Sequence, residues 1–215
     1  MALDPAPLRA LRVLDLSTGV AGPYAARVLR EAGAEVLKLE EPLGDPMRDW
    51  SASYKALPPG EDAGLFQFLN AGKQGVPCDL TTADGLEILG KLAAEADILI
   101  ENFGPLGFAE RKLGSLQDDH PHLSIVSISW WGHEGPWATR PANEWTLQAA
   151  IGMTARRGYP ERGPVACGGR FGEWSAGSCA AVAALAAVQS ARQTGRGDHV
   201  DLSVFESMLL CMTQY

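Results

Sequence analysis

The chain has 215 residues, of which 46% are hydrophobic and 20% charged, a composition typical of a globular protein with one sizeable core. Its formal net charge of −8 and isoelectric point near 5.0 disfavour a nucleic-acid partner, because phosphate contacts need clustered Lys and Arg. We expect no signal peptide and no membrane partner, since the Ala-rich run at residues 180–188 is too short to span a bilayer and is typical of a packed helix. The cytoplasm is therefore the expected location.

The four cysteines show no CxxC spacing and no nearby His pairing. They are Cys78, Cys167, Cys179 and Cys211. This pattern favours buried reduced thiols over zinc ligands or disulfides, and we expect no metal site.

The first unit of the chain has a β-α-β pattern. An apolar run at residues 13–16 is followed by a turn at residues 17–19, a helical pattern that ends at Gly33, and a second apolar run at residues 36–39. This order predicts an open, Rossmann-like parallel sheet whose ligands lie beyond the carboxyl ends of the strands. Any α/β domain can begin this way, and the absence of GxGxxG leaves a dinucleotide site without support.

The rest of the chain alternates strand and helix signals, as a parallel sheet with flanking helices requires. After a loop that contains Pro58, Pro59 and Gly60, the alternation of Phe66 and Phe68 predicts an extended segment. A turn at residues 71–75 precedes another extended segment. The later predicted elements are a helix capped by Thr82 or Asp84, strands at 97–100 and 123–129, a helix at 174–192, a strand at 199–202 and a helix from Ser203.

Candidate functional side chains follow the predicted turns and strand ends. They are Arg48, Lys73, Asn102, Phe103, Arg111 and Glu173. Each of four has an ordinary structural alternative: Lys73 as a solvated turn lysine, Arg48 paired with Asp45 at the surface, Asn102 satisfying its own loop, and Glu173 capping the helix that follows it.

Six segments taken together resemble the family III CoA-transferases, the group that includes formyl-CoA and carnitine CoA-transferases. In chain order they read VLDLSTGVAGPYAARVLREAGAEVLKLEEPLGDPMR, LNAGKQGVPCDL, ADILIENFGP, ISWWGHEGP, FGEWSAG and TGRGDHVDLSVFESM. No single motif is diagnostic, but their order covers nearly the whole chain.

The resemblance implies that residues 1–215 are the N-terminal part of a large domain, and that a second, smaller domain is absent. Members of that family are longer and form interlocked homodimers. The last helical pattern is still apolar at residues 208–210 and no capping Gly closes it, which agrees with a fragment of a longer protein.

The resemblance also implies a chemistry, in which an acidic side chain attacks an acyl-CoA thioester and holds the acyl group as a mixed anhydride until CoA passes to a carboxylic acid acceptor. By motif position the nucleophile is Glu173, where the family normally carries Asp. One added methylene moves the carboxylate by about 1 Å, a displacement that can cost about a hundredfold in rate unless the pocket compensates. Coenzyme A is expected as substrate, with no tightly bound cofactor.

Other positions carry over from the family by motif. The turn of Thr18, Gly19, Val20 and Ala21 would lie against the CoA diphosphate. Lys73 and Arg111 would meet phosphates, and Asn102 and Phe103 would hold the pantetheine or adenine region. Glu41 stands where some members have Arg, so one phosphate contact is missing. Trp130 and Trp131 replace smaller residues and either narrow the acyl pocket or fill the core.

Two further readings stay open. The family also contains acyl-CoA racemases, but at their His-Asp position this chain has Asn143 and Glu144, and Asn cannot act as a base. His133, near in sequence, is expected at the surface. Alternatively, with Glu173 at the nucleophile position, the chain is a catalytically silent CoA-binding module of a larger protein.

Overall fold

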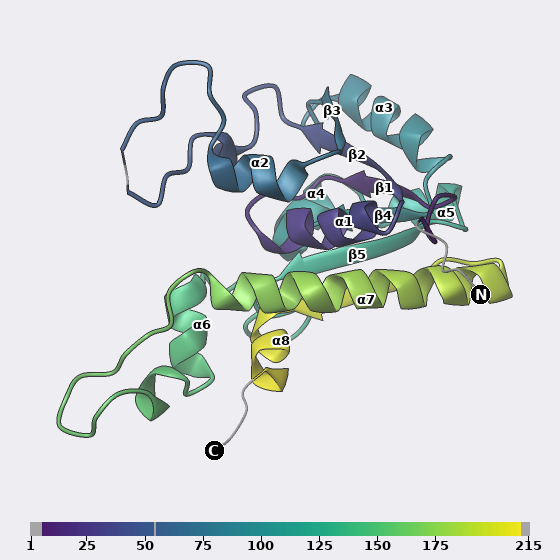
Figure 1. Ribbon diagram of the computed structural model, residues 1–215. Helices are drawn as coiled ribbons and strands as arrows, with labels where there is room; N and C mark the ends of the chain where they lie inside the picture. Colours follow the sequence, from purple (N-terminus) through teal and green to yellow (C-terminus); the bar gives the residue numbers. More distant parts are fainter. Residues whose placement is uncertain (1–5, 54, 212–215) are drawn as a thin grey trace, which may run out of the picture.

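The computed structural model describes residues 6–53 and 55–211, and its centre is a six-stranded sheet with all neighbouring strands parallel (Figure 1). The strand order is β3-β2-β1-β4-β5-β6. The strands are β1 Arg12–Asp15, β2 Glu35–Glu40, β3 Gln74–Pro77, β4 Ile98–Glu101, β5 Ser124–Ser129 and β6 His199–Ser203. The order reverses between β1 and β4, and this switch point is where a doubly wound sheet leaves a crevice for ligands.

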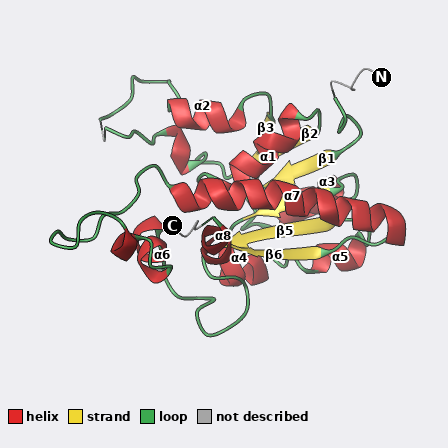
Figure 2. Cartoon of the chain, turned by 60° about the horizontal axis from the view of Figure 1, so that its bottom comes forward, coloured by secondary structure: helices red, strands yellow, loops and turns green. Residues whose placement is uncertain are grey.

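Helices cover both faces of the sheet. They are α1 Ala21–Glu31, α2 Gly64–Asn70, α3 Ala83–Ala93, α4 Gly104–Glu110, α5 Ser115–Asp119, α6 Glu144–Ala150, α7 Phe171–Thr194 and α8 Val204–Leu210, with short 3₁₀ turns η1 Pro46–Arg48 and η2 Thr154–Arg156. On one face α1 and α7 lie side by side, and α7 crosses in front of the strands in Figure 2. On the other face the core contains side chains of α3, α4 and α5.

The expected α/β class and most of the expected elements are confirmed. All residues of β4 and β5 are buried, as parallel strands covered on both faces should be. Thr82 caps α3 by accepting a hydrogen bond from the Gly85 amide at 3.1 Å.

The expected extended segment around Phe66 and Phe68 is wrong, because residues 64–70 form helix α2. Phe66 and Leu69, three positions apart, are buried on one side of this helix, whereas Phe68 is 47% exposed. The alternation of two aromatic residues was too short to distinguish a strand from a helix.

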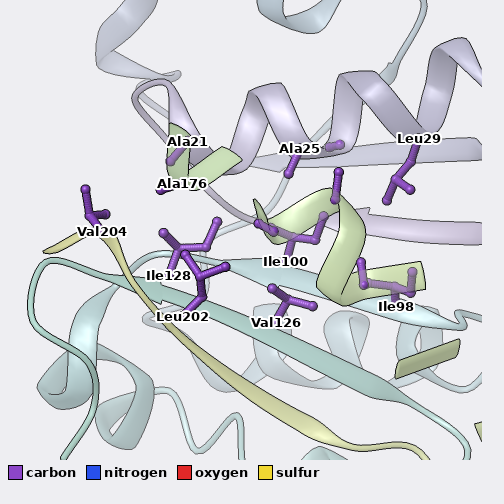
Figure 3. Close-up of a cluster of buried hydrophobic side chains, with 14 of the residues drawn as sticks. Ala21, Ala25, Leu29, Ile98, Ile100, Val126, Ile128, Ala176, Leu202 and Val204 are labelled. Atoms are coloured by element: carbon purple, nitrogen blue, oxygen red, sulfur yellow. The ribbon is translucent and has the colours of Figure 1, made fainter. Parts of the chain in front are cut away.

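The larger core lies between the sheet and the α1–α7 layer. Figure 3 shows Ile100 and Ile128 from the strands facing Ala21, Ala25 and the other small side chains above them. Small residues let the helices approach the sheet and each other closely.

Helix α7 is longer than the sequence reading expected. It has 24 residues and is long and apolar enough, by length and composition, to cross a membrane. Half of its most apolar stretch is buried inside the protein, and α7 packs along α1 and β5, as the core helix of a globular fold does. The expectation that no segment reaches spanning length is therefore wrong, although a packed helix is what the structure contains.

The contact between α1 and α7 depends on Gly177. A Cβ atom at this position would lie 2.6 Å from the backbone oxygen of Ala21 and 3.0 Å from the Tyr24 ring. Because the obstructing atom belongs to the backbone, α1 would have to move.

We therefore predict that Gly177→Ala lowers the free energy of unfolding by about 1–3 kcal/mol, despite the better helix propensity of Ala. Gly90→Ala in α3 is the matched control, because no atom lies within 4 Å of its added Cβ, and it should stabilise the protein by up to about 1 kcal/mol. Urea unfolding measures both. Equal effects of the two substitutions would contradict the close approach at Gly177.

Candidate functional site

The site begins at the turn that joins β1 to α1, on the switch point of the sheet. Gly19 has φ +75°, a conformation that side chains disfavour. Asn102, directly after β4, accepts a hydrogen bond from the Thr18 amide at 2.9 Å and donates one to the Thr18 carbonyl at 2.7 Å. Asn102 thus satisfies backbone groups of the neighbouring turn and ties the ends of β1 and β4 together.

Beneath this turn lies a cluster of buried charges, formed by Asp15, Lys73, Lys38 and Asp45. The Lys73 ammonium is 2.7 Å from Asp15 Oδ2, and Lys38 Nζ is 3.1 Å from Asp45 Oδ2. Lys38 also donates to the Ser17 carbonyl at 2.7 Å, and Ser17 donates its hydroxyl and its amide to Asp15 Oδ1. Burial raises the pKa of Asp15, but the ammonium groups of Lys73 and Lys38 and its hydrogen bonds outweigh burial and hold this pKa below its usual value.

The place of Lys73 corrects both sequence readings of this residue. Its side chain is 1% exposed, and its ammonium also donates to the Pro23 carbonyl at 2.9 Å and to Asn70 Oδ1 at 2.8 Å. Lys73 is therefore not a solvated turn lysine. With three acceptors for its three hydrogens, it has none to offer a CoA phosphate.

Arg48 also differs from its expected surface pair with Asp45. Its guanidinium donates to both carboxylate oxygens of Glu40 at 2.8 Å and to Asp62 at 2.7 Å, while Asp45 pairs with Lys38 instead. Arg48 therefore anchors the loop after β2.

Glu173 is the third residue of α7 and is 5% exposed. Its Oε2 accepts the Val20 amide hydrogen at 3.0 Å, and its Oε1 lies 2.6 Å from Arg170 Nε. The carboxylate therefore faces the β1–α1 turn. The alternative that Glu173 caps α7 is wrong. Glu144 of α6 has that role, because it accepts the Gly172 amide hydrogen at 2.8 Å at the start of α7.

A cavity of about 170 Å³ opens beside Glu173. Its lining includes Ala21 from α1, Asn102 and Phe103 after β4, and Ser129 and Trp130 at the end of β5. Ser129 is 7% exposed, and within the described residues its hydroxyl has no hydrogen-bond partner. Trp130 contributes to this wall, whereas Trp131 packs on Trp137 and Phe205 outside the cavity lining.

A second cavity, of about 350 Å³, adjoins the same turn. Thr18, Phe103 and Arg111 line it together with apolar residues such as Leu39 and Leu80. Phe103 lines both cavities, and the Arg111 guanidinium lies 4.1 Å from the centre of the Phe103 ring.

Arg111 is paired with Glu41, the residue that stands where some family members have Arg. Their closest N–O distance is 3.3 Å, and the Glu41 side chain is 53% exposed. Arg111 Nε is buried and has no hydrogen-bond partner in residues 6–53 and 55–211. The guanidinium thus keeps one donor that no described residue uses.

The structure brings most of the candidate residues to one edge of the sheet. Glu173, Val20, Ala21, Asn102 and Phe103 surround the first cavity or bond to its lining, and Thr18 and Arg111 lie at the second. Lys73 lies in the core below. No cluster of metal ligands, meaning three or more His, Cys, Asp or Glu, occurs in the part of the chain that the structure describes.

Sequence reasoning missed Arg170 and Glu144. Arg170 adopts φ +59° just before α7, and no local pattern marks a residue that pairs with Glu173 three positions on. Glu144 was noted only as a replacement, although Asn143 before it is a signal for a helix start: Asn143 caps α6 by accepting the Thr146 amide hydrogen at 3.0 Å.

Two expectations on single residues are wrong. The His133 side chain is 11% exposed instead of lying at the surface, and Cys211 is exposed instead of buried. His133 lies below α4, where its ring contacts Phe108.

A doubly wound parallel sheet with a carboxylate and two cavities at its switch point defines the class of this chain, and comparison with known proteins identifies the family. The chain belongs to CoA-transferase family III, whose model matches residues 8–215. The recognition made from the six motifs is thus confirmed.

The chain is similar to the alpha subunit of succinyl-CoA–L-malate CoA-transferase of Chloroflexus aurantiacus, with 37% identity over 207 residues that cover 94% of this chain and 47% of the relative. It is 33% identical over 210 residues to the formyl-CoA:oxalate CoA-transferase of Streptomyces avermitilis, covering 95% of this chain and 49% of the relative. The chain spans about half the length of these relatives.

Solved structures of similar fold support the same family. A CAIB/BAIF family protein from Brucella suis superposes with a TM-score of 0.88 at 33% identity, covering 96% of this chain and 55% of that one. A Mycobacterium tuberculosis protein gives a TM-score of 0.87 at 31% identity, covering 97% and 58%.

We predict that Lys73→Ala lowers the free energy of unfolding by about 3–5 kcal/mol, because it leaves the Asp15 carboxylate buried without its ammonium partner. The loss should shrink as the pH falls, since a proton then neutralises Asp15 in the variant. Urea unfolding at several pH values measures this. Lys91→Ala, which removes an exposed i,i+4 pair with Glu87, is the control and should leave stability nearly unchanged. A Lys73→Ala variant as stable as this control would contradict the assigned role.

Proposed function

We propose that this chain binds acyl-CoA across the two cavities and transfers CoA to a carboxylic acid, with Glu173 as the nucleophile. The observation that carries the proposal is the 3.0 Å hydrogen bond from the Val20 amide to Glu173, which places the expected nucleophile against the expected coenzyme-binding turn. Membership of CoA-transferase family III and the printed activities of the relatives support the reaction class.

In the proposed binding mode, the nucleotide end of CoA occupies the second cavity and the thioester reaches Glu173 in the first. Phe103, which lines both, would lie along the pantetheine arm. Apolar side chains such as Leu39 and Leu80 suit the adenine ring, and Arg111 offers a planar donor to a phosphate.

In the proposed reaction, a Glu173 oxygen attacks the thioester carbonyl carbon, the C–S bond breaks, and CoA leaves as thiolate. The acyl group is then held on Glu173 as a mixed anhydride. The acceptor carboxylate attacks the Glu173 carbonyl carbon of this anhydride, and the first acyl group leaves as its free carboxylate. The CoA thiolate then attacks the acceptor carbonyl carbon of the second mixed anhydride, which forms the new thioester and frees the Glu173 carboxylate.

The residues around Glu173 suit this role. The Val20 amide and the Arg170 guanidinium fix the orientation of the carboxylate, and its place in the first turn of α7 favours its negative charge. The unpartnered Ser129 hydroxyl in the cavity wall is a donor for the developing negative charge on the thioester oxygen.

The extra methylene of Glu is accommodated by Gly19. A Cβ atom at position 19 would lie 3.2 Å from Glu173 Oε2, so the missing side chain leaves room for the longer acidic residue. This fit supports an active nucleophile.

One observation favours the alternative of a silent CoA-binding module. Both oxygens of Glu173 already accept hydrogen bonds, from Arg170 and Val20, and a carboxylate bonded to two donors attacks less readily. The racemase reading has no such support, because Asn143 and Glu144 are engaged in capping α6 and α7.

We predict that acyl-CoA and hydroxylamine convert Glu173 into a hydroxamate, detectable by peptide mass spectrometry. Glu173→Gln should abolish this label and CoA transfer while keeping CoA binding. Glu173→Asp should lower transfer by about a hundredfold, because it withdraws the carboxylate by about 1 Å from a pocket fitted to Glu. Glu35→Gln, a charge change at the far end of β2, is the control.

The silent-module alternative predicts the opposite pattern. No hydroxamate would form on the wild-type chain, and Glu173→Asp would gain transfer activity. Absence of CoA binding to every variant would contradict both readings.

We also predict that Glu41→Gln tightens CoA binding by about threefold to fivefold, because it releases Arg111 from a half-exposed ion pair. Isothermal titration calorimetry measures the dissociation constant. Arg111→Ala should weaken binding, and Glu35→Gln again controls for net charge. Equal affinities of Glu41→Gln and Arg111→Ala would refute a phosphate contact by Arg111.

A further inference from the structure

Another buried carboxylate, Glu101, lies next to the first cavity and takes no part in the proposed chemistry. Glu101 is the last residue of β4, its side chain is fully buried, and it immediately precedes Asn102 and Phe103 in the cavity wall. It points to the face of the sheet that α3, α4 and α5 cover, opposite the layer that carries Glu173.

One oxygen of Glu101 supports the pocket directly. Oε2 accepts the Phe103 amide hydrogen at 2.7 Å. The bond closes the turn between β4 and α4 and so fixes the position of Phe103 at the end of the sheet. A hydrogen bond to an ionised carboxylate is roughly twice as strong as one to a neutral acceptor, and the charge state of Glu101 therefore bears on this turn.

The other oxygen faces a second unsatisfied atom. Glu101 Oε1 and His133 Nε2 are both buried, both without a hydrogen-bond partner within the described ranges, and 3.8 Å apart. This distance is too long for a hydrogen bond, yet an approach of about 1 Å would create one. Such a bond requires one proton between them, since a bare carboxylate and an unprotonated ring nitrogen are both acceptors.

We propose that Glu101 is a positioning residue for the pocket, which holds the Phe103 amide with one oxygen and shares a single proton with His133 through the other. The consequence for CoA affinity rests on the proposed function, whereas the local proton sharing does not.

The surroundings allow the proton to bind near neutrality. Burial raises the pKa of Glu101 to about 7, against the opposing effects of Ser127, the Phe103 amide and Arg111, while Asp201 raises it further. Burial lowers the pKa of His133, so its ring is neutral, and the proposal takes the tautomer with its hydrogen on Nδ1, in which Nε2 is the acceptor. The remaining titratable neighbour is His199 of β6, which is hydrogen-bonded to Ser127 at 2.8 Å and whose pKa is likewise lowered by burial.

The direction of the effect follows. As the pH falls through about 7, a proton from the buffer binds Glu101 Oε1, and the new O–H donates to His133 Nε2. The carboxyl group is then neutral and holds the Phe103 amide less strongly. The pocket is therefore firmest above pH 7 and loosens below it.

The first test needs no ligand. In ¹H–¹⁵N NMR spectra of the free chain, the Phe103 amide signal should titrate with a midpoint near 7, and Glu101→Gln should abolish this titration while preserving the fold, because Gln donates to His133 at every pH. His133→Asn should move the midpoint to lower pH, since the protonated carboxyl loses its acceptor. A Phe103 signal that does not titrate, or that titrates unchanged in Glu101→Gln, would overturn the proposal.

The second test uses CoA binding by calorimetry at pH 6 and pH 8. The dissociation constant at pH 6 divided by that at pH 8 should be about fivefold larger for the wild type than for Glu101→Gln. Comparing the two proteins cancels the titration of the CoA phosphates. Glu35→Gln should behave as the wild type. Parallel pH dependence in Glu101→Gln and the wild type would overturn the link to the pocket, whereas a titrating Phe103 amide in a chain that binds no CoA would overturn the proposed function alone.

Discussion

The buried ion pair between Asp15 and Lys73 is the interaction on which the rest of the site depends. Asp15 ends the first strand, and its second oxygen accepts the Ser17 hydroxyl and amide, so the charge that Lys73 balances also shapes the turn above it. Lys38 adds a bond to the Ser17 carbonyl and pairs with Asp45. Removing water from four charged groups is costly, and it is tolerated here because each finds an opposite charge at close range. The turn that results is held by hydrogen bonds from side chains beneath it.

Above this cluster of buried charges, three chain segments meet at the switch point of the sheet and form the site. The β1–α1 turn supplies backbone amides, the segment after β4 supplies Asn102 and Phe103, and the start of α7 supplies Glu173. A different interaction holds each segment. Buried charges hold the β1–α1 turn, Glu101 bonds to the segment after β4, and Glu144 bonds to the start of α7. The Glu173 carboxylate, held on a helix and bonded to Val20 and Arg170, has a defined orientation at this meeting point.

The sequence predicted the sheet well because strands covered on both faces read as continuous apolar runs, as at residues 97–100 and 123–129. It failed at residues 64–70, where two aromatic residues are too few to define a period. For the site, the family motifs singled out Glu173, Asn102 and Phe103, and the structure brings these three residues to one cavity. They did not reveal that Lys73 is buried, because its partner Asp15 lies 58 positions away and nothing local marks the pairing. Arg170 was also missed, because no local pattern marks a non-glycine residue with a positive φ.

The hydrogen bond between Val20 and Glu173 joins positions 153 residues apart. During synthesis on the ribosome, the β1–α1 turn emerges long before Glu173, because the chain is made from its N-terminus. A nascent or partly unfolded chain in which α7 has not docked on α1 therefore holds a carboxylate without orientation. The arrangement at this edge of the sheet is thereby completed only when segments from the first and last thirds of the chain have assembled.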